Sequence, residues 1–454
     1  MNGLAERVRK RERGYGVISR WQEDRVNQSV HPKTMKQPSI LILGAGLAGL
    51  SAAETLSDAG FRVVLLESKS EVGGRTHSQR LDGAVIERGA EFYHPDHHAR
   101  VVQRMAAFGL TPLLLPKSAE VTWLCEAGAA RRLGDWDSFK GSLLSQQINR
   151  DSGRFDPSLW WSEGAAEFDI SWQDYLDRLE GDEDDKRRLK ALLHTLTGST
   201  AAHHSALGVL REIAQFGGLD EALNANEYRI KGGTLQLSTA IETRLLDEGA
   251  AEIRFGASVK SIDRAVSRYQ VTLEEGGIIE ADALLVALPL NVATSLTWRD
   301  GLGEAYPSLM ARLGSHANRS RKHWFAVPEP FEDRISSDTS SIAFTEGSGQ
   351  LGCVISPSEA SLEREAGLLS LDVNAERIVS DHDWVEDPAA KGAWMTPRVG
   401  QIPLLHEVHQ LSINQPRLQW VGGDWSPAWA GWMEGAIRSG EDAAVRLIRS
   451  FSRA

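Results

Sequence analysis

The sequence predicts an α/β protein organised around a parallel sheet, and a βαβ unit near the beginning of the chain is the main evidence. Residues 40–43 form an apolar run typical of a buried strand. A glycine-rich turn at residues 44–49 follows and feeds a helix that extends to about residue 59. Residues 62–66 form a second apolar run, which ends at Glu67. Strand, glycine turn, helix and strand in this order indicate a Rossmann-like unit.

The glycine turn has the spacing of a dinucleotide-binding turn. Gly44 permits a tight turn, Gly46 lets the backbone approach a pyrophosphate, and Gly49 lets the helix pack closely on the strand. The pyrophosphate then lies at the helix N-terminus, where free N–H groups and the helix dipole favour an anion. Glu67 can accept hydrogen bonds from ribose hydroxyls. The predicted cofactor contacts in the turn are Gly44, Ala45, Gly46, Leu47, Ala48 and Gly49.

A second glycine pair follows Glu67. Gly73 and Gly74 supply flexible backbone. Arg75 supplies a guanidinium that we expect to reach the cofactor phosphates bidentately, with Thr76 beside it. The alternative interpretation is a glycine turn in some other α/β protein. The strand, the helix, the acidic residue and the second glycine pair agree with one another, and together they favour the dinucleotide site.

Length and composition are those of an ordinary globular protein. The 454 residues suffice for about two or three domains. The net charge of −12 argues against nucleic acid or an anionic membrane as the main partner. Cys125 and Cys353 match no metal or redox spacing, which fits a reducing compartment. Because the chain has no membrane-length apolar run and no secretory signal, we expect a cytoplasmic protein.

We assign no function to two parts of the sequence, the N-terminal 37 residues and the histidine-containing turns. Residues 1–37 are charged and poorly patterned, so we expect a leader that is either a short exposed helix or disordered. His94, His97 and His98 are metal-ligand types, but they lie in a Pro-Asp-His-His turn rather than as a pair on a helix face. A solvated helix start is the favoured interpretation, also for the histidine pair at residues 203–204, and no metal site is predicted.

The first long insertion covers residues 99–230. It reads mostly as helices and separates two parts of the nucleotide-binding sheet. Acidic residues at 182–185 precede basic residues at 186–188, an order that suits the helix dipole. A glycine turn at residues 231–234 then feeds another helix, and the apolar run at residues 283–287 predicts a further buried strand.

Two further segments are expected to contact the cofactor. Gly89 and Ala90 allow a ligand to approach the backbone closely. Glu91 and Phe92 follow, and the aromatic ring of Phe92 can line the base of a pocket. Val259 is expected on the adenine side, where a backbone amide and carbonyl can pair with the base.

The end of the chain returns to the cofactor. A strand at residues 418–421 leads to Gly423 and Asp424, and a helix opens near Trp432 and Met433. A second helix N-terminus at this place can stabilise negative charge on a reduced cofactor.

A second insertion covers residues 291–400. It contains strand-like runs at residues 323–327, 341–344 and 352–355. We expect these runs to form a sheet that makes up one wall of a substrate cavity.

These motifs resemble those of the flavin monoamine oxidase and polyamine oxidase family. The resemblance covers about residues 38–450. It rests on the GAGLAG turn with GGRT behind it, the GAEF segment, the strand ending in Ala-Leu-Pro and the terminal GWMEGAIRSG. In that family the cofactor is FAD. The implied architecture is a Rossmann-like FAD-binding domain with a discontinuous α+β substrate domain inserted in two pieces. The FAD-binding domain would comprise residues 38–98, 231–290 and 401–454, and the substrate domain residues 99–230 and 291–400.

The resemblance implies a catalytic lysine that holds a water against flavin N5. Lys322 precedes an apolar strand and the Pro330-Phe331 pair at the matching spacing, and it is therefore assigned this role. The alternative is that Lys322 belongs only to a surface cluster with Arg319 and Arg321.

The family also frames the flavin with two aromatic side chains. Trp432 and Trp394 match these two positions, and Trp384 matches the tryptophan that stacks on the flavin. Many members have tyrosine at the two framing positions, and tryptophan offers the larger π-face to an amine or a flat substrate. The alternative is that Trp394 and Trp432 are core residues.

The implied activity is oxidation of a small-molecule amine. The imine that forms hydrolyses to a carbonyl compound, and O₂ as electron acceptor gives hydrogen peroxide. Members with covalent flavin have a cysteine where this chain has Ala393, so the resemblance implies non-covalent FAD. A homodimer is compatible with the sequence, and neither nucleic acid nor a membrane is an expected partner.

Two alternatives stay open at this point. FAD-dependent desaturases or dehydrogenases that act on C–C bonds, of the phytoene desaturase or protoporphyrinogen oxidase type, share the N-terminal motif. The Trp-Met-Glu-Gly-Ala segment and Lys322 favour amines over these substrates. The other alternative is a non-catalytic FAD-binding protein, which predicts bound flavin that no amine, amino acid or alkene reduces.

Overall fold

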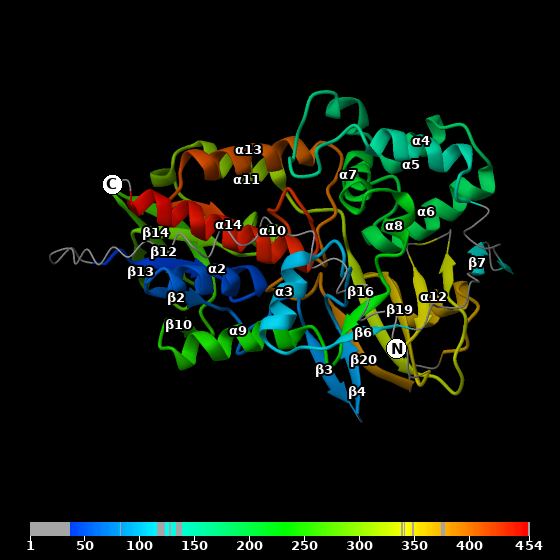
Figure 1. Ribbon diagram of the computed structural model, residues 1–454, viewed down its shortest axis with the longest axis horizontal. Coiled ribbons are helices and arrows are strands. Elements are labelled where there is room, and N and C mark those ends of the chain that lie inside the picture. The colour runs from blue at the N-terminus through cyan, green and yellow to red at the C-terminus, as the bar shows by residue number, and fades with distance from the viewer. Residues whose placement is uncertain are drawn as a thin grey trace, which may run out of the picture. The chain divides into compact units, whose positions relative to one another are not determined.

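The structure, a computed structural model, describes the chain from Gln37 to Ser452 with short gaps (Figure 1). The gaps are residues 82, 116–122, 127–128, 133–138, 337–338, 340, 347–348 and 374–376, and side chains are not described at residues 191–196. Apart from Gln37, the charged leader predicted for residues 1–37 lies outside the described residues. Everything below concerns the compact unit that begins at Pro38.

The predicted parallel sheet is present and draws its strands from distant parts of the sequence. All neighbouring strands are parallel, in the order β10 (Ala251–Arg254), β2 (Val63–Leu66), β1 (Ile40–Leu43), β14 (Ala283–Val286) and β21 (Leu418–Trp420). β1 and β14 lie in the interior of the sheet and are buried at every residue. This explains their continuous apolar sequences, because a parallel strand is covered on both faces.

Each face of the parallel sheet packs against a different layer. Ile40 and Ile42 face a core with the helices α2 (Leu47–Asp58), α3 (Ala99–Ala107), α9 (Leu235–Asp247) and α14 (Met433–Ser452). Leu41 and Leu43 face a second core that includes α11 (Ala305–Leu313) and α13 (Gln401–Asn414). The alternation follows from the two-residue period of a strand. These layers occupy the left half of Figure 1.

A smaller sheet adjoins the second core. Its order is β13 (Ile278–Ala281), β12 (Arg268–Leu273), β11 (Val259–Ala265) and β15 (Thr297–Trp298). Short helical segments, α10 (Leu290–Ala293) and η3 (Asp300–Leu302), flank β15 in the sequence.

The helices of the first insertion form as predicted. They are α4 (Leu143–Ser152), η2 (Ala165–Phe168), α5 (Trp172–Arg178), α6 (Glu183–Thr197), α7 (Ala206–Phe216) and α8 (Leu219–Leu223). Ser171 and Asp182 cap α5 and α6, because their side chains accept hydrogen bonds from N–H groups of the first turn.

The second insertion builds the predicted sheet. The strand order is β20 (Ile378–Asp383), β16 (Ser320–Ala326), β19 (Leu351–Pro357), β18 (Ile342–Thr345), β17 (Arg334–Ser336), β7 (Trp123–Glu126) and β8 (Ala129–Arg132). β7 and β8 come from the first insertion, which the sequence did not indicate. β8 is exposed at every residue and therefore has no apolar alternation to detect. α12 (Leu362–Leu368) packs on β19.

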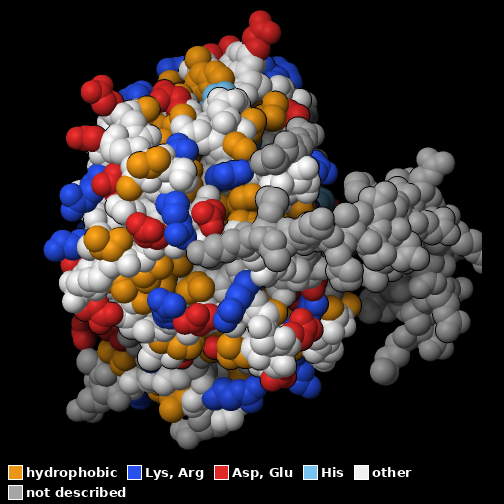
Figure 2. All heavy atoms as spheres, turned by 90° about the vertical axis from the view of Figure 1, so that its left-hand side faces the viewer, with side chains coloured by type: hydrophobic (Ala, Val, Ile, Leu, Met, Phe, Trp, Pro, Cys, Tyr) orange, Lys and Arg blue, Asp and Glu red, His pale blue; other side chains and the backbone are white. Residues whose placement is uncertain are grey.

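Short strands connect these parts. β3 (Ser78–Leu81) pairs with β4 (Ala84–Glu87), while β5 (Phe92–Tyr93) and β6 (Pro112–Leu114) flank β9 (Tyr228–Ile230). Within the described part of the chain, no helix combines the length and the apolar character needed to cross a bilayer. On the face drawn in Figure 2, basic and acidic side chains are interspersed among hydrophobic ones.

Candidate active site

The glycine turn between β1 and α2 has the geometry that the sequence predicts. Gly44 has φ +98°, and an added Cβ would lie 2.8 Å from Ala287 O. An added Cβ at Gly49 would lie 2.1 Å from Gly44 O, so the helix packs directly on the turn. At Gly46, by contrast, an added Cβ meets nothing nearer than 3.9 Å. That distance to Gly73 O is ordinary van der Waals contact, and Gly46 lines the cavity described below at the N-terminus of α2, where an anion can bind.

Glu67 closes this turn from the end of β2. Its Oε2 accepts a hydrogen bond from Ala45 N at 2.8 Å, and its Oε1 accepts one from Lys69 N at 2.9 Å. A carboxylate oxygen accepts about two hydrogen bonds, so capacity remains for ribose hydroxyls. Glu67 also lines the cavity described below, which keeps the predicted contact open to it.

Arg75 is held by other parts of the chain. Its Nη1 donates to Ala393 O at 2.6 Å, and its Nη2 donates to the Asp424 carboxylate at 2.7 Å. Each Nη atom carries two N–H groups, so these two bonds leave donors for a phosphate, and Arg75 lines the cavity described below. The bidentate phosphate contact stays a prediction. Arg75 also ties the early glycine segment to the end of the chain.

Asp424 lies behind the cavity wall. It is completely buried, and its Oδ2 accepts a hydrogen bond from Leu290 N at 2.8 Å while its Oδ1 pairs with Arg75. Asp424 thus joins three segments and is not among the cavity-lining residues. Ala45 and Gly49 also do not line the cavity. Asp424, Ala45 and Gly49, which were predicted as cofactor contacts, therefore lie behind the residues that form the cavity wall.

One continuous cavity connects the glycine turn with the sheet of the second insertion. Its volume is about 1480 Å³. This exceeds the roughly 300–1,000 Å³ of ordinary ligand sites, so the cavity can hold a dinucleotide together with a second molecule. The other predicted cofactor residues line it: Gly44, Gly46, Leu47, Ala48, Glu67, Gly74, Arg75, Thr76, Gly89, Ala90, Glu91, Phe92, Val259, Trp384, Gly423, Trp432 and Met433. The three predicted catalytic residues line it too: Lys322, Trp394 and Trp432.

Lys322 is buried in β16 among fixed acceptors. Its Nζ donates to the Glu91 carboxylate at 2.6 Å, to Gly89 O at 2.9 Å and to Glu87 O at 3.3 Å. The residue is only 4% exposed, so the interpretation of Lys322 as an ordinary surface lysine is wrong. The backbone acceptors belong to the segment that leads into the predicted Gly89–Phe92 cofactor contact.

Glu91 is shared between two cations. Its Oε2 pairs with Lys322, and its Oε1 pairs with Arg229 of β9. All three side chains are buried, and the Arg229 guanidinium lies 5.2 Å from the centre of the Phe92 ring. A buried charge is tolerated only when it is paired, so the two cations and the carboxylate fix one another. Sequence reading missed Arg229, because nothing in its neighbourhood identifies its partner.

The tryptophans assigned to the flavin site line one cavity. Trp394 and Trp432 are both only partly buried, which does not fit the interpretation as core residues. Gly431, which precedes Trp432, lies beside Trp394, because an added Cβ at Gly431 would be 3.7 Å from Trp394 Cδ1. Trp384 is deeper, and its Nε1 donates to Arg88 O at 2.8 Å.

Glu212 is the main site residue that sequence reading missed. It lines the cavity from α7, and its Oε1 accepts a hydrogen bond from Trp432 Nε1 at 2.8 Å. Burial raises the pKa of Glu212 to about 7, although the hydrogen bond from Trp432 acts in the opposite direction. A cavity-lining indole N–H usually finds an acceptor, but this rule does not say which residue supplies it.

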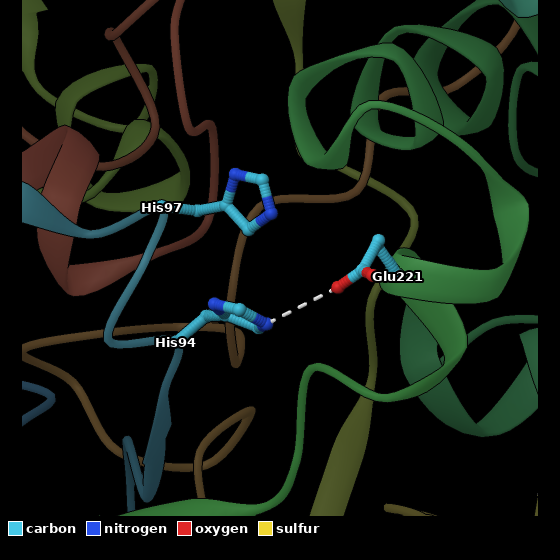
Figure 3. A group of neighbouring side chains, drawn as sticks. All are labelled: His94, His97 and Glu221. Atoms are coloured by element: carbon cyan, nitrogen blue, oxygen red, sulfur yellow. Dashed lines mark ion pairs between the residues drawn. The ribbon is translucent and has the colours of Figure 1, made fainter. Parts of the chain in front are cut away.

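The histidine turn before α3 meets Glu221 of α8 (Figure 3). His94 Nε2 lies 3.6 Å from the Glu221 carboxylate, and the His94 and His97 ring centres are 4.5 Å apart. His94 Nδ1 accepts a hydrogen bond from Asp96 N at 3.2 Å, which leaves the ring proton on Nε2 when the ring is neutral. A metal would need a lone pair on Nε2, so this hydrogen bonding favours a His–Glu contact over a metal ligand.

The histidines are less solvated than the sequence suggested. His98 and His204 are completely buried, and burial lowers the pKa of His98 to about 3. His98 Nδ1 accepts a hydrogen bond from His94 N at 3.0 Å, and its ring lies 4.9 Å from Trp432. The expectation of a solvated helix start is therefore wrong for His98 and His204, because tertiary packing covers both rings.

Comparison with known proteins gives a consistent result. A family model described as flavin-containing amine oxidoreductase matches residues 47–448. The (S)-6-hydroxynicotine oxidase of Paenarthrobacter nicotinovorans is 25% identical over 443 residues, covering 90% of this chain and 99% of the relative. A pseudooxynicotine dehydrogenase of a Pseudomonas species is 24% identical over 449 residues, covering 90% and 85%. A triple mutant of putrescine oxidase has a similar fold, with a TM-score of 0.77 at 20% identity, covering 92% of this chain and 99% of the other.

Proposed function

Because the chain belongs to the family of flavin-containing amine oxidoreductases, we propose that it oxidises a small amine at its C–N bond. The product is an imine, which hydrolyses to a carbonyl compound. The cofactor of this enzyme is FAD. The observation that carries the proposal is the shared cavity, which is lined by the dinucleotide turn and also by Lys322, Trp394 and Trp432.

The residues present fit FAD. The part of the cavity lined by Gly46 at the N-terminus of α2 suits the pyrophosphate, and Glu67 suits the ribose. The cavity continues past Gly89 toward the tryptophans, so there is room for a flavin ring beyond the phosphates. When bound, the flavin accepts the hydrogen and the two electrons that leave the substrate carbon.

The protein groups have separate tasks in this proposal. Trp394 and Trp432 present π-faces between which an amine can bind. Lys322, fixed by Glu91 and Gly89 O, holds a water at the reacting edge of the site with its third N–H, which in the protein alone makes the long 3.3 Å contact with Glu87 O. Because the Lys322 side chain is buried, it cannot rotate out into bulk solvent. This arrangement positions the substrate and limits the access of water.

The proposed electron acceptor is O₂, with hydrogen peroxide as its product. The names of the relatives include both an oxidase and a dehydrogenase, so the acceptor needs its own test. The purified protein, reduced by an amine without air, is mixed with aerated buffer in a stopped-flow instrument. Rapid return of the flavin absorbance with formation of peroxide is the expected result, and reoxidation over minutes would reject O₂ as the working acceptor.

The amine assignment is tested by anaerobic bleaching of the bound flavin. A panel of primary, secondary and cyclic amines is compared with alkenes and with amino acids. We expect bleaching by one or more amines, with a carbonyl product that forms in equal amount. Bleaching by alkenes alone would favour the C–C desaturase alternative, and no bleaching by any compound would favour the non-catalytic one.

We also predict that the FAD is dissociable. Neither a cysteine nor a histidine is among the described residues that line the cavity, and Ala393 occupies the position of the attaching cysteine. Acid precipitation is therefore expected to leave yellow flavin in the supernatant. A yellow pellet after washing would contradict this prediction.

A further inference from the structure

We propose that Glu212 binds the ammonium form of the substrate and accepts its proton before the C–H bond is oxidised. This inference rests on the proposed function and adds a substrate-binding residue to it. It also specifies the form in which the substrate arrives, which is the cation and not the neutral amine.

The carboxylate of Glu212 is directed at the cavity and has a free oxygen. Oε1 accepts the hydrogen bond from Trp432 Nε1 at 2.8 Å. Oε2 has no hydrogen-bond partner and no ion-pair partner within the part of the chain that the structure describes. Because Glu212 lines the cavity beside Trp432, its free oxygen is available to a ligand that the tryptophan also contacts.

The adjacent arginine does not neutralise Glu212. The Arg211 guanidinium donates to the carbonyls of Leu159 and Pro427 at 2.9 and 2.5 Å and lies 4.9 Å from the centre of the Trp160 ring. Arg211 also lines the cavity, but its guanidinium is held by these backbone carbonyls and forms no ion pair with Glu212 in the described part of the chain. Glu212 is only partly exposed, and an unpaired carboxylate in such a place is costly, so a cationic ligand would supply the missing partner.

The electrostatic environment suits proton transfer near neutral pH. Burial raises the pKa of Glu212 to about 7, and the hydrogen bond from Trp432 opposes this increase. The charged groups on α7 and on the elements packed against it do not shift this pKa: Arg211 on the same helix, Arg150 and Asp151 on α4, Glu167 on η2, Asp174, Asp177 and Arg178 on α5, and Asp220 and Glu221 on α8. An alkylammonium has a pKa of about 10 in water, like a lysine side chain, so an amine reaches the site protonated.

The step is a simple proton transfer. One N–H bond of the ammonium breaks, an O–H bond forms at Glu212 Oε2, and no electrons are exchanged. The amine that results has a free lone pair on nitrogen, which is needed to support the loss of hydride from the adjacent carbon. A carboxylate with a pKa near the working pH is suited to such a task.

The test uses a cation that cannot be oxidised. In tert-butylamine the carbon attached to nitrogen has no hydrogen, so the compound can bind and cannot turn over. Its dissociation constant for the FAD-loaded protein is measured by calorimetry and by flavin difference absorbance between pH 6 and pH 8.5. In the unmodified protein we expect affinity to rise with pH through about pH 7, because Glu212 becomes an anion while the ligand remains a cation.

Three variants distinguish the effect of the negative charge of Glu212 from effects on the local structure. Glu212→Gln keeps an oxygen that can accept from Trp432 but cannot hold a negative charge, so we expect binding at pH 8 to weaken about 10- to 100-fold and to lose its pH dependence. Glu212→Asp keeps the charge and should retain the pH dependence with weaker binding. Glu221→Gln removes the same charge from neighbouring α8, outside the cavity lining, and should bind like the unmodified protein.

The outcomes are distinct. If Glu212→Gln folds, retains FAD and binds tert-butylamine within about twofold of the unmodified protein at pH 8, the inference is overturned; about twofold corresponds to only about 0.4 kcal/mol. Because the ligand is never oxidised, failure of every amine to bleach the flavin would reject the proposed function without affecting this measurement. Loss of binding in Glu212→Gln alone supports the inference.

Discussion

Replacement of Lys322 by methionine is expected to slow either flavin reduction or its reoxidation by about 100-fold or more, while FAD remains bound. Lys322 is the single cation that donates to both Glu91 and Gly89 O in the described site, so no other described side chain can take over its position. The measurement is a pair of stopped-flow experiments, one with amine in the absence of air and one with O₂ after reduction.

The fold should survive this substitution. Glu91 keeps its pairing with Arg229, so the carboxylate is not left alone in the interior. Methionine retains most of the lysine stem and fills a similar volume. The visible flavin spectrum and the Tm report on integrity. Lys231→Met, at an exposed position in the turn before α9, is the matched control and should behave like the unmodified protein. Unchanged traces for Lys322→Met would remove this lysine from the mechanism.

Substitution of Gly46 by valine is expected to weaken FAD binding by about 100-fold or more, which corresponds to about 2.8 kcal/mol. The backbone of Gly46 has φ −73° and ψ 175°, a conformation that valine adopts readily. An added Cβ there would make ordinary van der Waals contact with Gly73 O at 3.9 Å, so the apoprotein can accommodate it. Because Gly46 lines the cavity, we expect the added methyl groups to occupy space proposed for the pyrophosphate. FAD affinity is measured by titration of the apoprotein with quenching of flavin fluorescence.

Gly49 provides the contrasting control. Alanine at this position would place Cβ 2.1 Å from Gly44 O, so the helix must move away from the turn. We expect Gly49→Ala to lower the stability of the apoprotein by about 1–3 kcal/mol, seen as a lower Tm, whereas Gly46→Val leaves the apoprotein Tm nearly unchanged. Normal FAD affinity in folded Gly46→Val would show that the pyrophosphate does not lie at this turn.

Much of the fold is readable from local patterns. The run at residues 40–43 predicts β1 because a strand buried on both faces must be apolar throughout. The starts of α5 and α6 are local in the same way, because the side chains of Ser171 and Asp182 satisfy N–H groups within the next few residues. Each of these signals needs only neighbours in the sequence. The pairing of β7 with β17 has no such signal, because the two strands are far apart in the chain.

The residues of the candidate site also form two groups, those that could be assigned from the sequence and those that were found only in the structure. The positions of Lys322, Trp394 and Trp432 follow from motif spacing, and the structure brings all three to one cavity. Their partners do not follow from spacing. Lys322 pairs with Glu91, Trp432 with Glu212, and Arg75 with Asp424, and each pair is separated by more than 200 residues. For Arg75, the protein acceptors Ala393 O and Asp424 could not be seen from the sequence.

The dinucleotide turn and the main strands and helices can be predicted from the chain before it folds, because backbone conformation and apolar periodicity are set within a few residues. The resemblance to flavin-dependent amine oxidases adds the candidate site residues. The pairing of charges, the burial of histidines and the acid that faces the cavity become visible only in the folded protein. Such properties depend on side chains that packing brings together from distant segments, and on the loss of water around them.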